Sequence, residues 1–454
     1  MLRYLLIVVI NTLCLSLAGQ PSYPVFQSKA DSVKYATLQN LINSYFTPAR
    51  NLEPRDQRTL DSLLTKHAEL RSRIIGYKTT YLKHPDFIDY SELENGNTSP
   101  ERIVKLSYTK KSRKLPAVIT RCTSLTKLEI LNSSITKLPA RLRKLKKLQT
   151  VYVYNNSAKL KLARNTTITG LLIRGTEGRF IPTSFKKLTA LDSLDLSKNI
   201  GLNRFPDVSR NKQLRKLLLI ENRITLTDLK ASKTNPALRE LYLQRNAIGN
   251  VPATVGRFTG LQKLLFNYNP ITEVDQAIGQ LKNLEEISFY QNDLTEIPAG
   301  IFNLKNLRVI DLYFNQIEKI PPDLGNLTNL QILYLSNNRI TSLPETIGQL
   351  KNLQELYLHN NRLSYLPEQT KELRQLQVLR INDNLFTTFP EPVLALTQLE
   401  NLDLSGNTLR QFPLELQHFS KLKILVLINN HWENPADMEL VCKTLASQGT
   451  IIHQ

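Results

Sequence analysis

The chain has 454 residues, a length that ordinarily corresponds to about three globular domains. Hydrophobic residues make up 41% of it and charged residues 22%, which excludes a largely disordered protein, and its three cysteines are too few for a disulfide-stabilised scaffold. The formal net charge of +20 predicts a surface that attracts polyanions.

Residues 1–19 are predicted to be a signal peptide, because a basic start is followed by a mostly apolar run at 5–17 and by small residues before a cut after Ala18 or Gly19. The run is shorter than the roughly 20 apolar residues that span a membrane, so no transmembrane segment is expected in the mature chain. The protein is therefore predicted to be exported, whether secreted, periplasmic or at the cell surface. The alternatives are a hydrophobic first helix of the mature fold and a lipoprotein start at Cys14.

Residues 20–102 are predicted to form a helical N-terminal cap region. Apolar residues recur at helical spacing from Asp31 to Phe46 and again from Pro54 to Tyr77. The turn-rich stretch at 92–100 marks the end of this region. A separate functional domain is the alternative to a cap that covers the open end of a repeat array.

A 23-residue repeat dominates the rest of the chain. The sequence at 330–350, LQILYLSNNRITSLPETIGQL, recurs at 353–373 as LQELYLHNNRLSYLPEQTKEL, which gives the template L-x-x-L-x-L-x-x-N-x-L-x-x-L-P-x-x-I-x-x-L. About fifteen units are predicted over 103–430, regular from Leu191. The template asparagine recurs every 23 residues, at Asn246, Asn269, Asn292, Asn315, Asn338, Asn361, Asn384, Asn407 and Asn430. The first four units hold Lys111, Ser133, Asn156 and Thr176 there, so the asparagine ladder is expected to be weak in them.

Each template position has a physical role. The L-x-L core alternates with period two, which predicts a short strand with inward leucines and, from stacked units, a parallel sheet on a concave face. The asparagine side chain can bond backbone groups that the turn exposes, and the Leu-Pro step ends the strand. The I-x-x-L spacing predicts a short helical turn on the convex back. An amphipathic segment from Pro435 to Leu445 predicts a C-terminal cap over 431–454, and Cys122 and Cys442 are expected to be buried free thiols.

These units resemble the leucine-rich repeat superfamily, in the 23-residue class found in plant intracellular Ras-group-related proteins and in bacterial repeat proteins. The resemblance implies an α/β solenoid, a leucine-rich-repeat horseshoe with a parallel concave sheet, short convex helical or irregular turns and a small N-terminal helical cap. It implies a binding role without naming the partner, because this fold carries receptors, scaffolds, inhibitors and adhesins.

Aromatic residues occupy variable positions that are expected on the concave face. Adjacent strands lie about 4.8 Å apart, so Tyr290 should neighbour Tyr313 and Tyr334 should neighbour Tyr357. Exposed aromatic rings of this kind suit contact with a protein or a cell-surface glycan, and the alternative is that they only stabilise the sheet. The predicted partner-binding residues, called the aromatic ribbon below, are Tyr242, Tyr268, Tyr290, Tyr313, Phe314, Tyr334, Tyr357 and His359.

Most of the net charge lies in the first repeats, which follow the template less closely. Residues 101–190 hold 21 lysines and arginines against three glutamates, a local balance of +18. Such a surface can hold an anionic polymer through charge alone, and a solvated face is the alternative. The candidate polyanion-binding residues, called the basic cluster below, are Lys110, Lys111, Arg113, Lys114, Arg141, Arg143, Lys144, Lys146 and Lys147. Sequence-specific binding of nucleic acid is not expected, because no motif that recognises bases accompanies them.

No catalytic, cofactor-binding or metal-binding residue is predicted, because the chain contains no H-x-x-x-H, C-x-x-C, P-loop, G-x-S-x-G or kinase signature. We therefore predict an exported, non-catalytic binding protein that presents the aromatic ribbon to a protein or glycan partner. The alternatives are a polyanion-binding surface protein that uses the basic cluster, and an intracellular signalling scaffold if the N-terminus is not cleaved.

Overall fold

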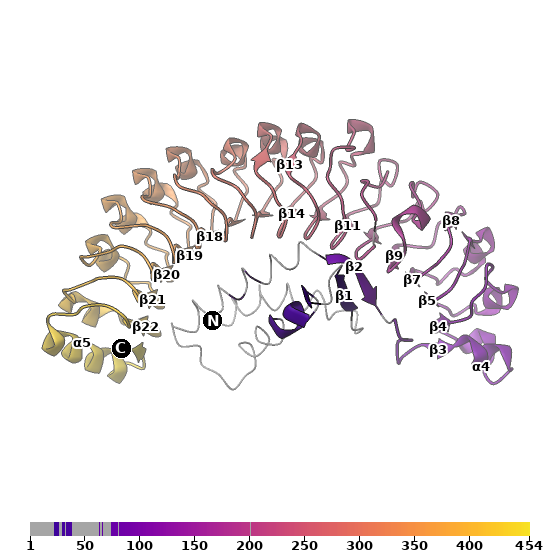
Figure 1. The fold of residues 1–454 in the computed structure, drawn as a ribbon, viewed down its shortest axis with the longest axis horizontal. Helices are drawn as coiled ribbons and strands as arrows, with labels where there is room; N and C mark the ends of the chain where they lie inside the picture. Colours follow the sequence, from indigo (N-terminus) through magenta and orange to yellow (C-terminus); the bar gives the residue numbers. More distant parts are fainter. Residues whose placement is uncertain are drawn as a thin grey trace. The chain divides into compact units, whose positions relative to one another are not determined.

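The computed structural model describes residues 22–26, 30–31, 33–38, 63, 66, 74–79, 81–199 and 201–454. The predicted signal peptide lies outside these residues. The chain divides into two compact units, Met1–Arg223 and Ile224–Gln454, called the N-terminal and C-terminal units below. Figure 1 shows that the strands of each unit lie along one face and that short helical turns lie along the opposite face.

The described residues of the predicted N-terminal cap region are only partly helical, and most of the predicted second helix lies outside them. Residues 30–31 and 33–38 are helical, as the spacing from Asp31 predicts. The predicted second helix is wrong at its end, because β2 (Ile74–Thr79) is a strand that pairs antiparallel with β1 (Ser22–Phe26). The β-branched and aromatic residues of β2 favour an extended chain, and this preference outweighs the helical spacing of the apolar positions.

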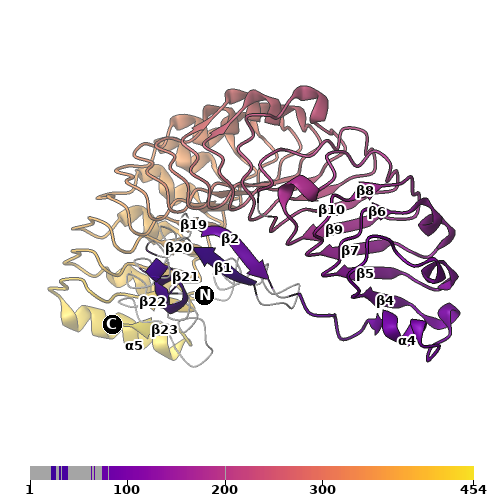
Figure 2. The ribbon, with the colours of Figure 1, turned by 45° about the vertical axis from the view of Figure 1, so that its right-hand side comes forward.

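A parallel sheet forms the inner layer of the N-terminal unit, and Figure 2 shows its strands side by side. The strands are β3 (Ile88–Asp89), β4 (Lys105–Tyr108), β5 (Lys127–Leu131), β7 (Thr150–Tyr154), β9 (Gly170–Arg174), β10 (Ser193–Asp195) and β11 (Lys216–Leu218), paired in that order. The short helix α4 (Tyr90–Glu94) follows β3, and a second parallel pair joins β6 (Lys137–Leu138) to β8 (Lys161–Leu162). The second residue of each strand from β4 onward is apolar and buried, as the template predicts.

The C-terminal unit continues the same design with greater regularity. Its strands are β12 (Glu240–Tyr242), β14 (Lys263–Leu265), β16 (Glu286–Ser288), β17 (Val309–Asp311), β18 (Ile332–Tyr334), β19 (Glu355–Tyr357), β20 (Val378–Arg380), β21 (Asn401–Asp403) and β22 (Ile424–Val426), all parallel. Each strand residue pairs with the residue 23 positions later, so the sequence period is also the pairing register. Burial of each inward leucine stabilises the unit by about 1.5–3 kcal/mol relative to an exposed leucine.

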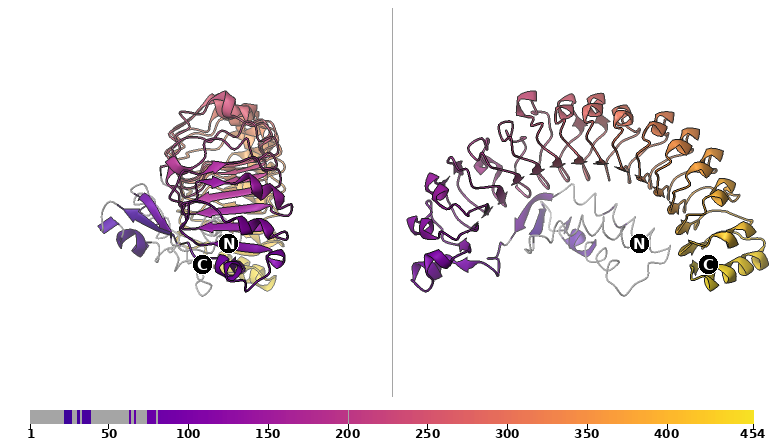
Figure 3. Two further views of the ribbon diagram at one scale, coloured as in Figure 1. Left: turned by 90° about the vertical axis from the view of Figure 1, so that its right-hand side faces the viewer. Right: turned by 180° about the vertical axis from the view of Figure 1, so that it is seen from behind.

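Helical turns rather than full α-helices form the outer layer, which the view from behind in Figure 3 also shows. They are 3-10 helices: η1 (Pro100–Arg102), η2 (Ala117–Arg121), η3 (Ala140–Lys144), η4 (Gly178–Phe180), η5 (Ala231–Lys233), η6 (Ala253–Arg257), η7 (Gln276–Gln280), η8 (Ala299–Asn303), η9 (Pro322–Asn326), η10 (Glu345–Gln349), η11 (Glu368–Glu372), η12 (Glu391–Ala395) and η13 (Leu414–His418). Close packing between neighbouring turns requires a glycine at 256, where a Cβ would lie 2.2 Å from the carbonyl oxygen of Ala277. Asp275 replaces the template proline before η7, and its carboxylate accepts a hydrogen bond of 2.8 Å from the N–H of Ala277. A further pair of short strands, β13 (Asn250–Val251) and β15 (Glu273–Val274), precedes η6 and η7.

The predicted asparagine ladder is present. In a typical unit, the Nδ2 of Asn315 donates to the carbonyl oxygens of Phe289 (2.9 Å) and Leu312 (3.0 Å), and its Oδ1 accepts from the N–H of Leu294 (3.1 Å). The ladder is weaker in the first units, where the shorter Ser133 replaces asparagine and its hydroxyl contacts the carbonyl oxygens of Lys110 (3.0 Å) and Ser112 (3.2 Å). The ladder asparagines therefore pair backbone groups that the turns would otherwise leave unsatisfied.

The C-terminal end forms a helix and a strand. The helix α5 (Pro435–Ser447) covers the segment predicted to be amphipathic, and β23 (Ile451–His453) pairs parallel with β22, which the template does not foresee. Cys122 and Cys442 are free and buried, as predicted. The predicted α/β solenoid of leucine-rich units is thus confirmed.

Candidate functional site

Each repeat of the C-terminal unit has three kinds of position: a buried leucine in the strand, the strand residues on either side of it, which face the concave side, and a turn residue. In β18, the buried Leu333 is flanked by Ile332 and Tyr334, whose side chains lie on the opposite face of the strand. The residue before each ladder asparagine forms the turn and has a positive φ, 60° at Tyr268 and 56° at Phe314. These two members of the aromatic ribbon therefore lie at turns rather than on strands, a position that aromatic residues rarely occupy.

One group of rings brings together the central part of the ribbon. The ring centroids of Tyr290 lie 5.1 Å from Tyr268, 5.3 Å from Tyr313 and 6.0 Å from Phe314, and Tyr313 lies 4.5 Å from Phe314. Tyr313 also reaches His359, at 5.6 Å. Four aromatic side chains from three neighbouring units thus form one continuous cluster, which confirms the predicted adjacency of Tyr290 and Tyr313.

A second group lies on the next two strands. Tyr334 and Tyr357 are paired in register and stack with centroids 4.7 Å apart and an interplanar angle of 20°, as the strand spacing predicts. Tyr242 lies on β12, and its hydroxyl donates to Glu240 at 2.7 Å. The ribbon therefore contains at least two groups of packed rings, and Tyr242 lies on a further strand.

Several ribbon residues are less exposed than predicted. Tyr290, Tyr313, Tyr334 and Tyr357 keep only 4–6% of their surface exposed and His359 keeps 3%, so the predicted exposure is wrong for them. Packing between rings of neighbouring units contributes to this burial. Tyr242, Tyr268 and Phe314 remain partly exposed.

Charged groups lie beside the rings. The guanidinium of Arg245 lies 4.7 Å from the ring centroid of Tyr268, and that of Arg380 lies 5.9 Å from the ring of Tyr357. The hydroxyl of Tyr357 donates to Glu355 at 2.9 Å. Cations over aromatic faces are favourable by about 0.5–2 kcal/mol, so these arginines help to fix the rings they cover.

Two titratable residues of this face have displaced pKa values. Burial raises the pKa of Asp311 to about 7, and the nearby charge of Glu286 adds to this, while hydrogen bonds from the Ser288 hydroxyl and the Tyr313 N–H oppose it. Burial also lowers the pKa of His359 to about 3, helped by the charge of Arg380. His359 is therefore neutral at physiological pH, and one of its ring nitrogens bonds the Ser336 hydroxyl at 2.8 Å.

The free energy of unfolding of the Asp311→Asn variant is expected to increase, relative to that of the unchanged protein, as the pH rises from 5 to 8. The native carboxyl keeps its proton up to about pH 7, whereas in the unfolded chain it ionises near pH 4. The native state thus binds the extra proton, and raising the pH through this window lowers the free energy of unfolding. Urea unfolding of both proteins at several pH values measures the difference. A difference that stays constant from pH 5 to 8 would show that Asp311 ionises normally.

The basic cluster lies on the surface of the N-terminal unit. All of its members are exposed except Arg141, which is partly buried and donates to the carbonyl of Leu115. Lys110 pairs with Glu94. Arg141, Arg143 and Lys144 belong to η3, one of the 3-10 turns of the outer layer.

A column of lysines extends this basic surface, and its members Lys137 and Lys161 were missed in the sequence. Lys137 of β6 pairs in register with Lys161 of β8, and Lys114 of the basic cluster holds the position of Lys137 one repeat earlier. All three are exposed. Like charges directly opposite each other destabilise a sheet, so their recurrence at one template position was the available signal.

Part of the concave face of the N-terminal unit is covered by the chain's own residues 81–87, which the sequence also did not indicate. The ring of Tyr81 stacks on Tyr154 at 4.7 Å, and the ring of Phe87 lies 6.2 Å from Tyr152. A Cβ at Gly175, which has φ of 64°, would lie 2.4 Å from the Tyr81 ring, so this glycine leaves room for it. The face over β5, β7 and β9 is therefore already occupied by a segment of the chain itself.

The described residues contain neither a metal-binding cluster nor a membrane-spanning helix. No group of three or more histidine, cysteine, aspartate or glutamate side chains there is placed to hold a metal ion. In the same part of the chain, no helix is both long enough and apolar enough to cross a bilayer.

Comparison with protein families matches a leucine-rich repeat region to residues 321–448 and a leucine-rich repeat to 259–317 and 282–340. Among solved structures, the leucine-rich repeat protein LIC12759 of Leptospira interrogans is 25% identical, with a TM-score of 0.62, over 81% of this chain and 100% of that one. An internalin of Listeria monocytogenes is 21% identical, with a TM-score of 0.50, over 78% of this chain and 87% of its own. A TDR receptor structure is 22% identical, with a TM-score of 0.55, over 75% of this chain and 62% of that one. A search of curated protein sequences gave no match.

The internalin and receptor likenesses concern the fold alone. The chain itself shows the features of this fold, namely the 23-residue register, the parallel sheet and the buried asparagine ladder. On these observations, the chain belongs to the leucine-rich repeat superfamily.

Proposed function

We propose that the chain is an exported, non-catalytic binding protein whose partner is a protein that contacts the concave face of the C-terminal unit. The observation that carries this proposal is the continuous cluster of Tyr268, Tyr290, Tyr313 and Phe314, with Arg245 over one of its rings. Aromatic and arginine side chains are the residue types that dominate binding energy at protein interfaces. A glycan that stacks on the same rings is the alternative occupant.

Within the cluster, the partly exposed side chains would make the contact and the buried ones would hold them in place. Tyr268 and Phe314 are partly exposed, and Tyr290 and Tyr313 pack against both. The repeat scaffold fixes these side chains before binding, which reduces the ordering cost of association. The N-terminal unit is a poorer candidate, because residues 81–87 already cover its concave face over β5, β7 and β9.

Tyr268→Ala is expected to weaken partner binding by about 30-fold, the effect of losing roughly 2 kcal/mol at an interface hot spot. The measurement is capture of surface proteins on the full chain, with washes at low and at about 0.5 M salt, where screening reaches only a few ångströms. Tyr365→Ala is the matched control, because Tyr365 is an exposed tyrosine outside the ribbon, with 54% of its surface accessible. A partner that survives salt but is retained equally by both variants would contradict the proposal.

The basic surface of the N-terminal unit favours a second candidate, binding of an anionic polymer. The aligned Lys137 and Lys161 repel each other unless an anion lies across them. In the same capture experiment, partners released by salt and by Lys137→Glu would move the function to the basic surface of the N-terminal unit, since contacts of lysine with polyanions are salt-sensitive.

Export is tested separately by the intact mass of the native protein. We expect a mature chain that begins after Ala18 or Gly19, because small residues precede both positions. A native chain that still begins at Met1 would contradict export by this signal and favour the intracellular scaffold.

A further inference from the structure

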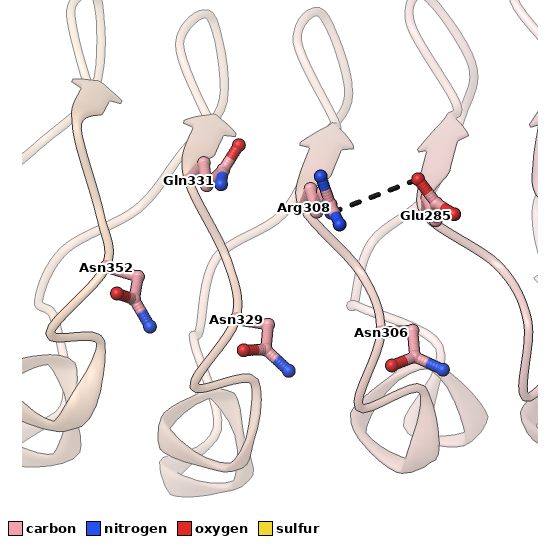
Figure 4. Close-up of a pocket in the computed structure, with 6 residues that line it drawn as sticks. All are labelled: Glu285, Asn306, Arg308, Asn329, Gln331 and Asn352. Atoms are coloured by element: carbon pink, nitrogen blue, oxygen red, sulfur yellow. Dashed lines mark ion pairs between the residues drawn. The ribbon is translucent and has the colours of Figure 1, made fainter.

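A polar groove of about 310 Å³ lies on the lateral side of the C-terminal unit, between the 3-10 turns and the beginnings of the strands. Figure 4 shows two rows of side chains in it. Glu285, Arg308 and Gln331 immediately precede β16, β17 and β18. The other row consists of Asn306, Asn329 and Asn352.

The three asparagines form a second ladder, separate from the buried one. Their Nδ2 atoms donate to carbonyl oxygens of the preceding unit, Asn306 to Lys282, Asn329 to Lys305 and Asn352 to Thr328, each at 2.8 Å. All three side chains are exposed. Among the described residues none donates to their Oδ1 atoms, so each unit offers an accessible acceptor whose position the scaffold fixes.

The groove carries no net charge. The guanidinium of Arg308 lies 3.9 Å from the carboxylate of Glu285, and Gln331 is neutral. The nearby lysines are held by backbone carbonyls, Lys282 by Asn303 at 3.1 Å and Lys305 by Asn326 at 3.0 Å. A neutral ligand rich in hydroxyl groups suits this lining, because it can donate to the asparagine oxygens and accept from Arg308 and Gln331.

The spacing of the groups favours a sugar chain over a peptide. Neighbouring units are in strand register, so the acceptors repeat about every 4.8 Å along the unit. An extended peptide on the same line would present N–H groups on one side only about every 6.7 Å, out of step with the row. Each ring of a sugar chain carries hydroxyl groups on both of its long edges, so successive rings can each donate to the row whichever way they face.

We propose that this groove binds a neutral polysaccharide chain that lies along the repeat axis across the units of β16 to β18. Hydroxyl groups of successive sugars would donate to Asn306, Asn329 and Asn352, while Arg308 and Gln331 would donate to sugar oxygens. The site is separate from the aromatic ribbon and does not depend on the function proposed for it.

The test is calorimetric titration of the full chain with two neutral β-1,4-linked probes, cellohexaose and chitohexaose, and with the acidic oligomer hexagalacturonate. We expect at least one neutral probe to bind with a Kd on the order of 1 mM or below. Gln331→Ala and Arg308→Ala should each weaken binding about three- to tenfold, the effect of one lost hydrogen bond. Gln377→Ala is the matched control, because Gln377 directly precedes β20 at the same template position but lies outside the groove. The affinity of this variant for the sugar probe should be unchanged.

Failure of both neutral probes to bind would overturn the proposal, as would equal affinities of Gln331→Ala and Gln377→Ala. Preference for the acidic oligomer, or for an extended peptide of similar length, would also overturn it. Tyr268→Ala should leave sugar binding intact, and Gln331→Ala should leave capture of the protein partner intact. Failure of either site is thereby distinguished from failure of the other.

Discussion

Asn315→Ala is expected to lower the free energy of unfolding of the C-terminal unit by about 3–5 kcal/mol, because it leaves several buried backbone groups unpaired at about 1–3 kcal/mol each. These groups are the carbonyls of Phe289 and Leu312 and the N–H of Leu294. Asn315 keeps 8% of its surface exposed, so water has little access to replace the lost contacts. The asparagine side chain supports two neighbouring units at once, and this explains its recurrence every 23 residues.

Urea unfolding followed by circular dichroism measures this effect, and Asn329→Ala provides a matched control. Asn329 belongs to the second ladder, is exposed and makes one hydrogen bond, to the carbonyl of Lys305. The same substitution should therefore cost only about 0.5–1 kcal/mol there. Equal losses for the two variants would show that the buried ladder has no special role in stability.

Asp195→Ala is expected to destabilise the N-terminal unit by about 3–5 kcal/mol, because it leaves a buried arginine without its counter-charge. Arg174 Nη2 lies 2.5 Å from Asp195 Oδ2, and the two side chains keep only 13% and 10% of their surface exposed. Burial alone would lower the pKa of Arg174, but the charge of Asp195 raises it. The N–H of Ser197 also donates to Asp195 at 2.8 Å and would lose its acceptor.

The double variant Arg174→Met with Asp195→Leu separates the pair from its parts. Replacing both charges with apolar groups of similar volume should recover most of the lost stability, since desolvation offsets much of the attraction in a buried pair. Urea midpoints of the single and double variants give the comparison. A double variant that is as unstable as Asp195→Ala would mean that the carboxylate acts through its contact with Ser197.

The repeat units were predictable because one physical rule recurs in each of them. At a 23-residue period, one local structure fits the alternation around Leu333, the ladder position of Asn338 and the Leu-Pro step. The structure contains it: a parallel strand followed by a turn that the asparagine side chain bonds. The neighbouring pairs Tyr290 with Tyr313 and Tyr334 with Tyr357 follow from the strand register alone.

The remaining features depend on contacts that a template does not contain. Strand β2 was missed because its apolar spacing also fits a helix, and its partner β1 lies about fifty residues earlier. The burial of the ribbon tyrosines depends on how neighbouring side chains pack, which the spacing does not specify. The second ladder had a sequence signal, an asparagine directly before the first leucine of four successive units, but the template begins one residue later.

Hydrogen exchange of the full chain with its captured partner tests the proposed binding face most directly. If the partner contacts the C-terminal unit, amides near Tyr268, Gln291 and Phe314, at the turns that follow β14, β16 and β17, should exchange more slowly in the complex. Amides near Lys111 and Lys144 should be unaffected. Protection confined to the basic cluster, with no change at these three turns, would contradict the account and assign binding to the N-terminal unit.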